Sequence, residues 1–315
     1  MYLGIDLGGT TCNFGLLDAS GVLHHRLEIP SQQHDGPDTM LPRLIAAARE
    51  VLAKSPVPVS AAGIGVPGPV KHAEGICVYA PNLTGWVNLP VGPRLSAGLG
   101  IPVHVLNDAN AAALGEVRFG AGQGSNDVLV LTLGTGIGSG LLLGGKLHIG
   151  ASERGAEVGH MTVAIDDKRG SAGNVGTLES VCGRDAIVWR AIRHLTWGVE
   201  SRILEVCPNL AELTPRNIAE AAELGDPIAQ QVWTETASYL AVGIVNVVFT
   251  ADVSRVVIAG GVAQAGDVLF KPLRRAVAAR TSRLYFDVEE IVPAQLGPAA
   301  GLIGAAQWAR ERTEA

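Results

Sequence analysis

Two polar residues stand where a buried strand gives way to a helix, and their side chains suit proton transfer. Residues 103–106 have the pattern of a buried strand, Asn107 and Asp108 follow it, and residues 109–117 have a helical pattern. In open α/β sheets, ligands bind at the carboxyl ends of the strands. A carboxylate at that position, beside an amide, suits a general base that accepts a proton from a hydroxyl group. Asp108 also suits the N-cap of the following helix, and the two roles are compatible.

Three glycine clusters follow strand-like segments, and each offers backbone N–H groups to an anion. Because glycine has no Cβ, the backbone comes close to a ligand at these positions. Asp6 lies at the start of the first cluster, and such a hard carboxylate can hold Mg²⁺ through water. A nucleotide needs contacts on more than one phosphate, so the clusters together favour nucleotide binding. The candidate ligands are Gly8, Gly9, Thr10 and Thr11 in the first cluster, Thr135 and Gly136 in the second, and Gly260 and Gly261 in the third.

Each cluster alone is also explained by a tight turn or by close packing of a strand against a helix. None of the three has the form G-x-x-x-x-G-K-[ST]. The order strand, glycine turn, strand also differs from a dinucleotide fingerprint, in which the glycines open a helix. The sequence therefore argues against a nicotinamide-dependent enzyme.

A second polar set, Glu157, His160 and Glu179, lies in a region with few charges. The hydroxyl groups of a hexose need both donors and acceptors, which carboxylates and a neutral imidazole supply. Spacing alone favours a solvated loop at these positions. The set becomes a candidate sugar site only together with the motifs described above.

Strands alternate with helices along the chain, which predicts an α/β fold with two lobes. The segment strand, glycine turn, strand occurs near residues 3–17 and again near residues 128–143, as a weak internal repeat. We expect a smaller α/β domain formed by residues 1–115 with about 298–315, and a larger α/β domain formed by residues 116–297. Residues 163–177 are polar and contain glycine, so we expect a loop there.

The composition narrows the class of protein. The chain has 315 residues with a formal net charge of −6 and shows no basic run, which argues against a nucleic-acid surface. It shows no signal peptide pattern, and no uninterrupted apolar stretch reaches about 18 residues, so we expect neither secretion nor a membrane span. Its four cysteines, Cys12, Cys77, Cys182 and Cys207, are far apart, which favours reduced thiols in the cytoplasm.

Taken together, these motifs resemble the ROK family (repressor, open reading frame, kinase) of the actin-like ATPase superfamily over nearly the whole chain. The resemblance rests on seven segments in order: GIDLGGT from Gly4, GIGVPG from Gly63, PNLTGW from Pro81, NDANAA from Asn107, LGTGIG from Leu133, Glu157-x-x-His160 with Leu178-Glu179, and IAGG from Ile258. It implies a two-lobed, ribonuclease H-like fold with the active site in the interdomain cleft.

The resemblance implies a sugar kinase that uses ATP and Mg²⁺. Asp108 would take the proton of a sugar hydroxyl, by analogy the 6-hydroxyl of glucose, and Asp6 would position Mg²⁺. The glycine loops would hold the phosphates, with the third cluster at the adenosine. The sugar ligands implied by the family are Gly68, Asn82, Asn107, Asp108, Glu157, His160 and Glu179. The family also implies a homodimer or homotetramer.

Two departures from the family pattern change these expectations. Thr11 stands where the family often has lysine, which removes one positive charge beside the phosphates. Three cysteines of the family's zinc segment are replaced by Gly170, Ala172 and Thr177. A closed zinc site needs four ligands, and neither Cys182 nor the aspartates at 166 and 167 supply a usual set. We therefore predict no structural zinc, with His160 oriented instead by a carboxylate or a backbone carbonyl.

Several alternatives stay open at this point. The substrate could be another hexose, such as N-acetylglucosamine, N-acetylmannosamine, mannose or fructose, and polyphosphate could replace ATP as the donor. A sugar-sensing regulator of the same family would need a DNA-binding domain ahead of the first phosphate motif. Asp6 lies five residues after Met1, which disfavours that alternative.

Overall fold

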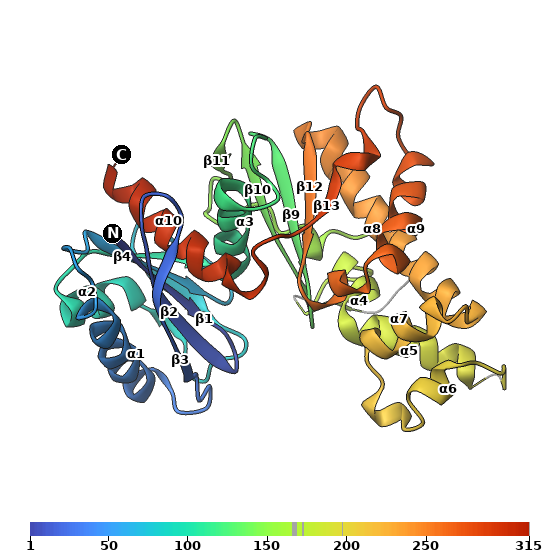
Figure 1. Cartoon of the computed structure of the whole chain (residues 1–315), viewed down its shortest axis with the longest axis horizontal. Helices are drawn as coiled ribbons and strands as arrows, with labels where there is room; N and C mark the ends of the chain where they lie inside the picture. Colours follow the sequence, from blue (N-terminus) through green and yellow to red (C-terminus); the bar gives the residue numbers. More distant parts are fainter. Residues whose placement is uncertain (166–168, 172, 197, 315) are drawn as a thin grey trace. The chain divides into compact units, whose positions relative to one another are not determined.

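Three β-sheets organise the chain in the computed structural model, which describes residues 1–165, 169–171, 173–196 and 198–314 (Figure 1). The sheets and their helices divide between two units. The first unit contains residues 1–124 and 140–156 and the chain from Gln295 onward, and the second contains residues 125–139 and 157–294.

The first unit is built on a five-stranded sheet of order β3-β2-β1-β4-β8. β1 pairs antiparallel with β2 and parallel with β4, and β4 pairs parallel with β8. The carboxyl ends of β1, β4 and β8 therefore meet at one edge. The elements of this unit are β1 (Tyr2–Leu7), β2 (Thr11–Leu17), β3 (Leu23–Pro30), α1 (Pro37–Leu52), β4 (Ala61–Val66), α2 (Val91–Leu99), β8 (Val103–Asn107), α3 (Asp108–Phe119), β11 (Lys146–Leu147) and α10 (Ala300–Glu314).

The two faces of this sheet are covered by different helices. Leu3 and Ile5 of β1 are fully buried in a cluster that includes Met40 of α1. Gly4, which lies between them, points to the opposite face, where a Cβ would collide with the carbonyl oxygen of Leu302 in α10. Since side chains alternate along a strand, glycine at this position lets α10 approach the sheet closely.

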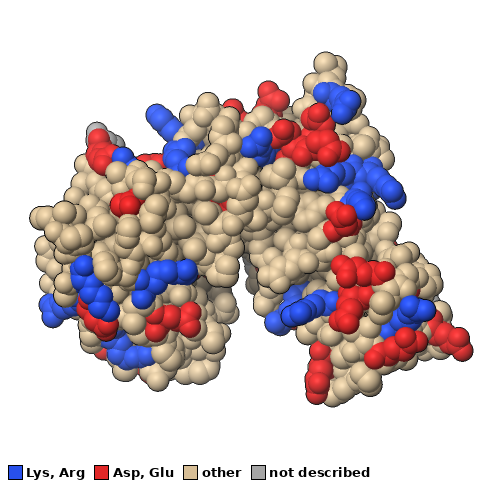
Figure 2. All heavy atoms as spheres, in the orientation of Figure 1, with Lys and Arg blue, Asp and Glu red and all other residues tan. Residues whose placement is uncertain are grey.

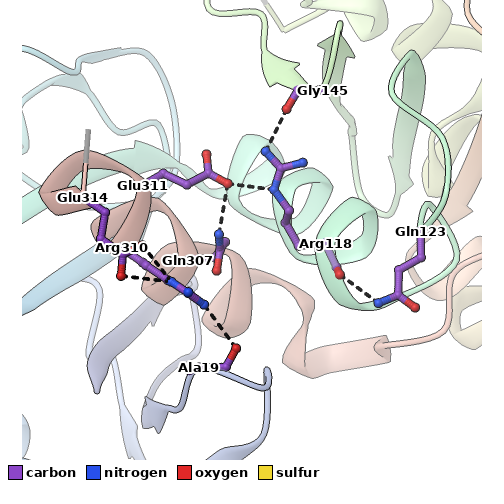
Figure 3. A network of polar contacts seen from close by, with 8 residues as sticks. All are labelled: Ala19, Arg118, Gln123, Gly145, Gln307, Arg310, Glu311 and Glu314. Atoms are coloured by element: carbon purple, nitrogen blue, oxygen red, sulfur yellow. Dashed lines mark hydrogen bonds and ion pairs between the residues drawn. The ribbon is translucent and has the colours of Figure 1, made fainter.

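Polar contacts fasten α10 to the rest of the first unit (Figure 3). The Nε atom of Arg118, in α3, lies 2.7 Å from Oε1 of Glu311 in α10, and the Arg118 Nη2 donates to the carbonyl oxygen of Gly145 at 2.7 Å. Gln307 donates to the same Glu311 carboxylate at 3.0 Å. The carboxylate of Glu116, fully buried, accepts hydrogen bonds from the backbone where the chain returns at 295 and 296. The C-terminal helix thus belongs to the first unit.

The second unit contains a parallel arrangement of β9, β12 and β13 within the sheet β11-β10-β9-β12-β13. β10 begins in this unit and runs into the segment of the first unit that holds β11. The further elements are β9 (Val128–Leu133), β10 (Ile137–Leu143), α4 (Leu178–Cys182), α5 (Arg184–Leu195), α6 (Ile203–Val206), α7 (Pro215–Glu223), α8 (Pro227–Ala251), β12 (Arg255–Ala259), α9 (Asp267–Ala278) and β13 (Ile291–Pro293).

The α8 helix is long and apolar enough to cross a membrane by length and composition alone. The greater part of the most apolar stretch of α8 is buried inside the protein, and Trp233, Leu240 and Ile244 are almost completely covered. It packs against α9, α7, α5 and α4. It is therefore a core helix of the second unit.

The division into units differs in detail from the expected domains. The expected boundary at residues 115 and 116 falls inside α3, which continues to Phe119. Residues 140–156, expected in the second domain, lie in the first unit. Gly140 explains this placement, because a Cβ there would collide with the side chain of Ala113 in α3.

Residues 70–89 add a small antiparallel sheet to the first unit. β5 (Val70–Lys71), β6 (Ile76–Tyr79) and β7 (Val87–Leu89) form an antiparallel sheet in the first unit. On the face drawn in Figure 2, Lys and Arg side chains are interspersed with Asp and Glu, without a continuous basic area among the described residues.

Candidate active site

Asp6 and Asp108 lie at the carboxyl ends of β1 and β8, two parallel strands of the first unit that flank β4. Asp6 belongs to β1, and Asp108 opens α3 directly after β8. Gly65 of β4, the strand between them, lies close to both: a Cβ there would be in ordinary contact, 3.7 Å from the Asp6 Oδ1 and 3.6 Å from the Asp108 Cα. A Cβ on Gly301 of α10 would lie 2.9 Å from the Asp6 Oδ1. The missing side chain of Gly301 therefore makes room for the Asp6 carboxylate.

The electrostatics of this pair favour a cation. Burial, followed by the negative charge of Asp108, raises the pKa of Asp6 from its usual 3.8 to about 7. Both causes disfavour the charged carboxylate, and a bound divalent cation would reverse them. Carboxylate oxygens also match the preference of Mg²⁺ for hard oxygen ligands. The residues at this edge thus fit Mg²⁺.

Asn107, and not Asp108, is the N-cap of α3. Its Oδ1 accepts the backbone N–H of Asn110 at 3.1 Å, and its Nδ2 donates to the Gly68 carbonyl oxygen at 3.1 Å. Asp108 is the first helical residue, and its Oδ1 accepts the N–H of Ala109 at 2.8 Å. The capping explanation for Asp108 was therefore wrong, because the preceding amide performs that role. Asn107 also joins Gly68 to the strand end, which brings two of the expected sugar ligands together.

The first glycine cluster forms a tight turn between β1 and β2. The Gly8 N–H donates to the Thr11 carbonyl oxygen at 3.0 Å, and Thr10 is exposed at the tip. Ser31 supports the turn because its hydroxyl donates to the Gly9 carbonyl oxygen at 2.6 Å. Asn82 lies nearby, with its Cβ 3.9 Å from a Cβ placed on Gly9. The structure thus brings Asn82 to the first glycine turn, the candidate phosphate loop.

Gln33 is a candidate site residue that the sequence analysis missed. In the amide orientation that satisfies both its oxygen and its nitrogen, Gln33 donates to the Gly9 carbonyl oxygen at 3.0 Å and to the Asn82 carbonyl oxygen at 3.2 Å. It therefore links the first glycine turn to the segment between β6 and β7 of the small sheet. No motif marks Gln33, and only the turn after β3 brings it to this position.

The turn formed by the second glycine cluster is hydrogen-bonded to one of the candidate sugar-binding side chains. The N–H of Ile137 donates to the Glu179 Oε2 at 3.1 Å, and a Cβ on Gly136 would collide with the same carboxylate. The Gly134 carbonyl oxygen accepts the N–H of Arg184 at 2.9 Å, while Thr135 is exposed. A side chain at position 136 would therefore displace the Glu179 carboxylate from its place in this loop. This contact makes Glu179 part of the loop.

Glu157, His160 and Glu179 influence one another in the second unit. Partial burial raises the pKa of Glu157 above its usual value, His160 opposes the rise, and the charge of Glu179 adds to it. Glu157 precedes the short 3₁₀ turn Val158–His160. The Ser139 hydroxyl oxygen in β10 accepts the Val158 N–H at 2.9 Å, which fixes the turn. The structure therefore brings these three residues together, which spacing alone did not favour.

The third glycine cluster divides into two positions with different surroundings. Gly260 has φ +89°, and a Cβ there would collide with the Leu133 carbonyl oxygen in β9. Close packing of strand against loop accounts for this glycine. Gly261 opens the 3₁₀ turn Gly261–Ala265, and nothing lies within 4 Å of a Cβ placed on it. Only Gly261 therefore offers an open, flat surface to a ligand.

Comparison with known proteins identifies the family. The ROK family model matches residues 2–312. The chain belongs to the ROK family. A glucokinase of Halalkalibacterium halodurans is 34% identical over 307 residues, which cover 96% of this chain and 93% of that protein.

Solved ROK structures have the same fold. A ROK glucokinase from Streptomyces griseus, in complex with glucose and AMPPNP, is 32% identical with a TM-score of 0.81, and the match covers 98% of this chain and 99% of that one. A ROK hexokinase from Thermus thermophilus is 30% identical with a TM-score of 0.82, and the match covers 99% of both chains. This ROK protein is thus a sugar kinase that is similar to glucokinases.

The residues of this ROK kinase do not fit the structural zinc of the family pattern. Gly170 has no donor atom, and the Thr177 Oγ1 already accepts the Ser180 N–H at 3.1 Å as the N-cap of α4. The Cys182 Sγ donates to the Thr236 carbonyl oxygen at 3.5 Å, away from any ligand set. Among the described residues, no three His, Cys, Asp or Glu side chains are grouped for a metal ion.

Positions 166, 167 and 172, which bear on the expected absence of zinc, lie outside the described residues. The absence of structural zinc stays a prediction. One observation bears on the expected orientation of His160: its Nδ1 is buried, and it has no hydrogen-bond partner within the described part of the chain.

Proposed function

We propose that this ROK kinase transfers the γ-phosphoryl group of Mg·ATP to the 6-hydroxyl of glucose, with Asp108 as the general base. The observation that carries the proposal is the pair Asp6 and Asp108 at the ends of β1 and β8, with the Asp6 pKa raised to about 7. The S. griseus relative solved with glucose and AMPPNP supports the same two substrates.

Asp108 accepts the proton of the sugar hydroxyl as that oxygen attacks the γ-phosphorus. The Ala109 N–H holds its Oδ1 at 2.8 Å, which fixes the carboxylate at the strand end. A positioned general base contributes about 10²–10⁴-fold to the rate. The Asn107 Nδ2 donates a hydrogen bond of 3.1 Å to the Gly68 carbonyl oxygen, which keeps the end of β8 and the Gly68 loop together. This bond therefore fixes the two expected sugar ligands relative to each other.

The nucleotide is held by backbone loops and by Asp6. Asp6 would hold Mg²⁺ through water, and the ion would supply positive charge to neutralise the phosphates; the remaining contribution is positioning. The turn from Gly8 to Thr11 and the Thr135–Gly136 turn supply backbone N–H groups and hydroxyls to the phosphates. Gly261 offers its open surface to the adenosine, whereas Gly260 supports the loop by close packing.

Glu157, His160 and Glu179 bind the sugar hydroxyls. Because the Glu179 Oε2 accepts the Ile137 N–H at 3.1 Å, a sugar bound to this carboxylate also orders the second phosphate loop. Sugar binding and phosphate binding are therefore coupled through Glu179. We further propose a cytoplasmic role in glycolysis and a homodimer or homotetramer, the latter on the family resemblance alone.

The experiment that tests this proposal is a coupled ADP-release assay with purified protein over a panel of sugars. Glucose should give the highest kcat/KM, ahead of N-acetylglucosamine, N-acetylmannosamine, mannose and fructose. A parallel series with polyphosphate as donor, followed by detection of glucose 6-phosphate, separates the two donors. Higher kcat/KM with another sugar, or with polyphosphate, would replace glucose or ATP in the proposal.

A further inference from the structure

The carbonyl oxygen of Gly9, in the first glycine turn, accepts two hydrogen bonds from the segment that follows β3. The Ser31 hydroxyl donates to it at 2.6 Å, and the side-chain amide of Gln33 donates to it at 3.0 Å. Ser31 is almost fully buried, and its backbone N–H donates to the next carbonyl oxygen of the turn, that of Thr10, at 2.9 Å. A carbonyl oxygen has two lone pairs. Both acceptor positions of Gly9 are therefore occupied, which fixes the plane of the peptide between Gly9 and Thr10.

The fixed peptide determines where the N–H of Thr10 points. The Gly9 carbonyl and the Thr10 N–H belong to one trans peptide unit, and in a trans peptide these two groups point in opposite directions. The N–H therefore points away from Ser31 and Gln33. Thr10 is exposed, and its N–H has no acceptor among the residues that the structure describes. Such an oriented N–H in a glycine turn suits an anion, and above all a phosphate oxygen.

Gln33 also contacts the segment that contains Asn82. The Gln33 amide nitrogen donates to the Asn82 carbonyl oxygen at 3.2 Å, and the backbone carbonyl oxygen of Gln33 accepts the Thr84 N–H at 3.0 Å. The amide oxygen of Gln33 accepts a hydrogen bond from the His34 Nε2 at 3.3 Å, which leaves the amide nitrogen facing the two carbonyls. One amide nitrogen thus joins the glycine turn to Asn82, an expected sugar ligand.

We propose that Ser31 and Gln33 are positioning residues for the nucleotide, which hold the Gly9–Thr10 peptide so that the Thr10 N–H donates to a phosphate oxygen of ATP. Gln33 in addition ties this phosphate contact to Asn82. The inference rests on the proposed function for the identity of the nucleotide. Ser31 and Gln33 act through the backbone of the turn and need no contact with ATP.

The proposal can be tested by calorimetric binding of AMPPNP with Mg²⁺ in the absence of sugar. S31A removes one donor to the Gly9 carbonyl oxygen, and Q33M removes the other while it keeps the length of the side chain. Because one donor still holds the carbonyl in each single variant, the Kd for AMPPNP should rise only about threefold. In the double variant the peptide is released, and the Kd should rise about tenfold more than the product of the two single effects.

The matched control is Q32M, at the exposed glutamine next to Gln33. It should bind AMPPNP with the wild-type Kd, and the melting temperature of every variant checks that its fold is retained. Steady-state kinetics test the contact with Asn82 separately. Only Gln33 donates to the Asn82 carbonyl oxygen, so Q33M should raise the KM for glucose about threefold, whereas S31A should leave it unchanged.

A double variant whose Kd equals the product of the single effects, or that binds AMPPNP as tightly as Q32M, would overturn the inference. Equal KM values for glucose in S31A and Q33M would overturn the tie to Asn82. Failure of the proposed function would look different. In that case the variants would lose affinity for AMPPNP as described, while the wild type would release no ADP with glucose.

Discussion

Replacing Asp6 by asparagine should make the free protein more stable at alkaline pH while it abolishes Mg²⁺-dependent turnover. Asp6 has its pKa raised from 3.8 to about 7 by burial and then by the charge of Asp108. The folded protein therefore binds a proton at Asp6 more tightly than the unfolded chain does. Stability from this group is greatest below pH 3.8, declines as the pH rises through the folded pKa, and is lowest above it.

The magnitude follows from the pKa shift. A shift of about three units corresponds to about 4 kcal/mol of lost stability at pH 8, and to about 2 kcal/mol at pH 5, where only part of the interval has been crossed. The D6N variant carries no charge and avoids this cost. Its advantage in the free energy of unfolding should therefore be about twice as large at pH 8 as at pH 5.

Urea unfolding without Mg²⁺ or nucleotide measures this difference at the two pH values. D18N is the matched control, because hydrogen bonds from Ser20 and His24 lower the pKa of Asp18. The stability from Asp18 is present at neutral pH and is lost as the pH falls, so D18N should destabilise the protein at pH 8. A D6N variant that is less stable than the wild type at pH 8, or equally shifted at both pH values, would refute the reasoning.

The remaining predictions concern a loop, a metal and a buried carboxylate. A Cβ in G136A would displace the Glu179 carboxylate. Two-substrate kinetics should therefore show higher KM values for both sugar and ATP. A rise in the KM for ATP alone would mean that Glu179 does not bind the sugar. Elemental analysis of chelator-treated protein should find no stoichiometric zinc, and the treated protein should keep full activity. Tightly held zinc whose removal lowers activity would show that the segment 163–177 binds the metal after all. E116A leaves three backbone N–H groups without their buried acceptor and should cost about 3–5 kcal/mol in urea unfolding, whereas a cost below 1 kcal/mol would mean that water replaces the carboxylate.

The strands and turns that hold the candidate site were predictable because their signals are local. The strand expected over residues 103–106 is β8, and the helix expected over residues 109–117 is α3 (Asp108–Phe119). Apolar periodicity and glycine clusters report burial and tight turns directly. The glycine turns after β1 and β9 therefore lie where the sequence places them.

Features that depend on tertiary contacts were not predictable. The small sheet β5-β6-β7 has strands of two to four residues, and Tyr79 and Val87 are exposed, so no alternating pattern marks it. The N-cap of α3 was assigned to Asp108, but Asn107 performs this role because its side chain also reaches Gly68. A glycine can make room for a ligand or for a neighbouring part of the protein. Only the three-dimensional structure shows which of the two lies against it.

The segment 163–177 shows the same limit at a larger scale. Its described residues form no helix or strand, as expected for a loop, but the isolated antiparallel bridges Thr162–Thr177 and Arg169–Val175 fold it back on itself. Gly176 has φ +63°, and a Cβ there would collide with the Ala164 carbonyl oxygen. The two halves of the segment thus approach each other through glycine, and a local pattern does not reveal that pairing.

The most direct test of the account is the phosphorylation of glucose by the wild type and by D108N with Mg·ATP. The account predicts that D108N binds glucose with the wild-type Kd, measured by calorimetry, while its kcat falls by about 10²–10⁴-fold. D108N keeps Asn107 as the N-cap of α3, so the fold should be retained. A D108N enzyme that forms glucose 6-phosphate at close to the wild-type rate would show that Asp108 is not the base.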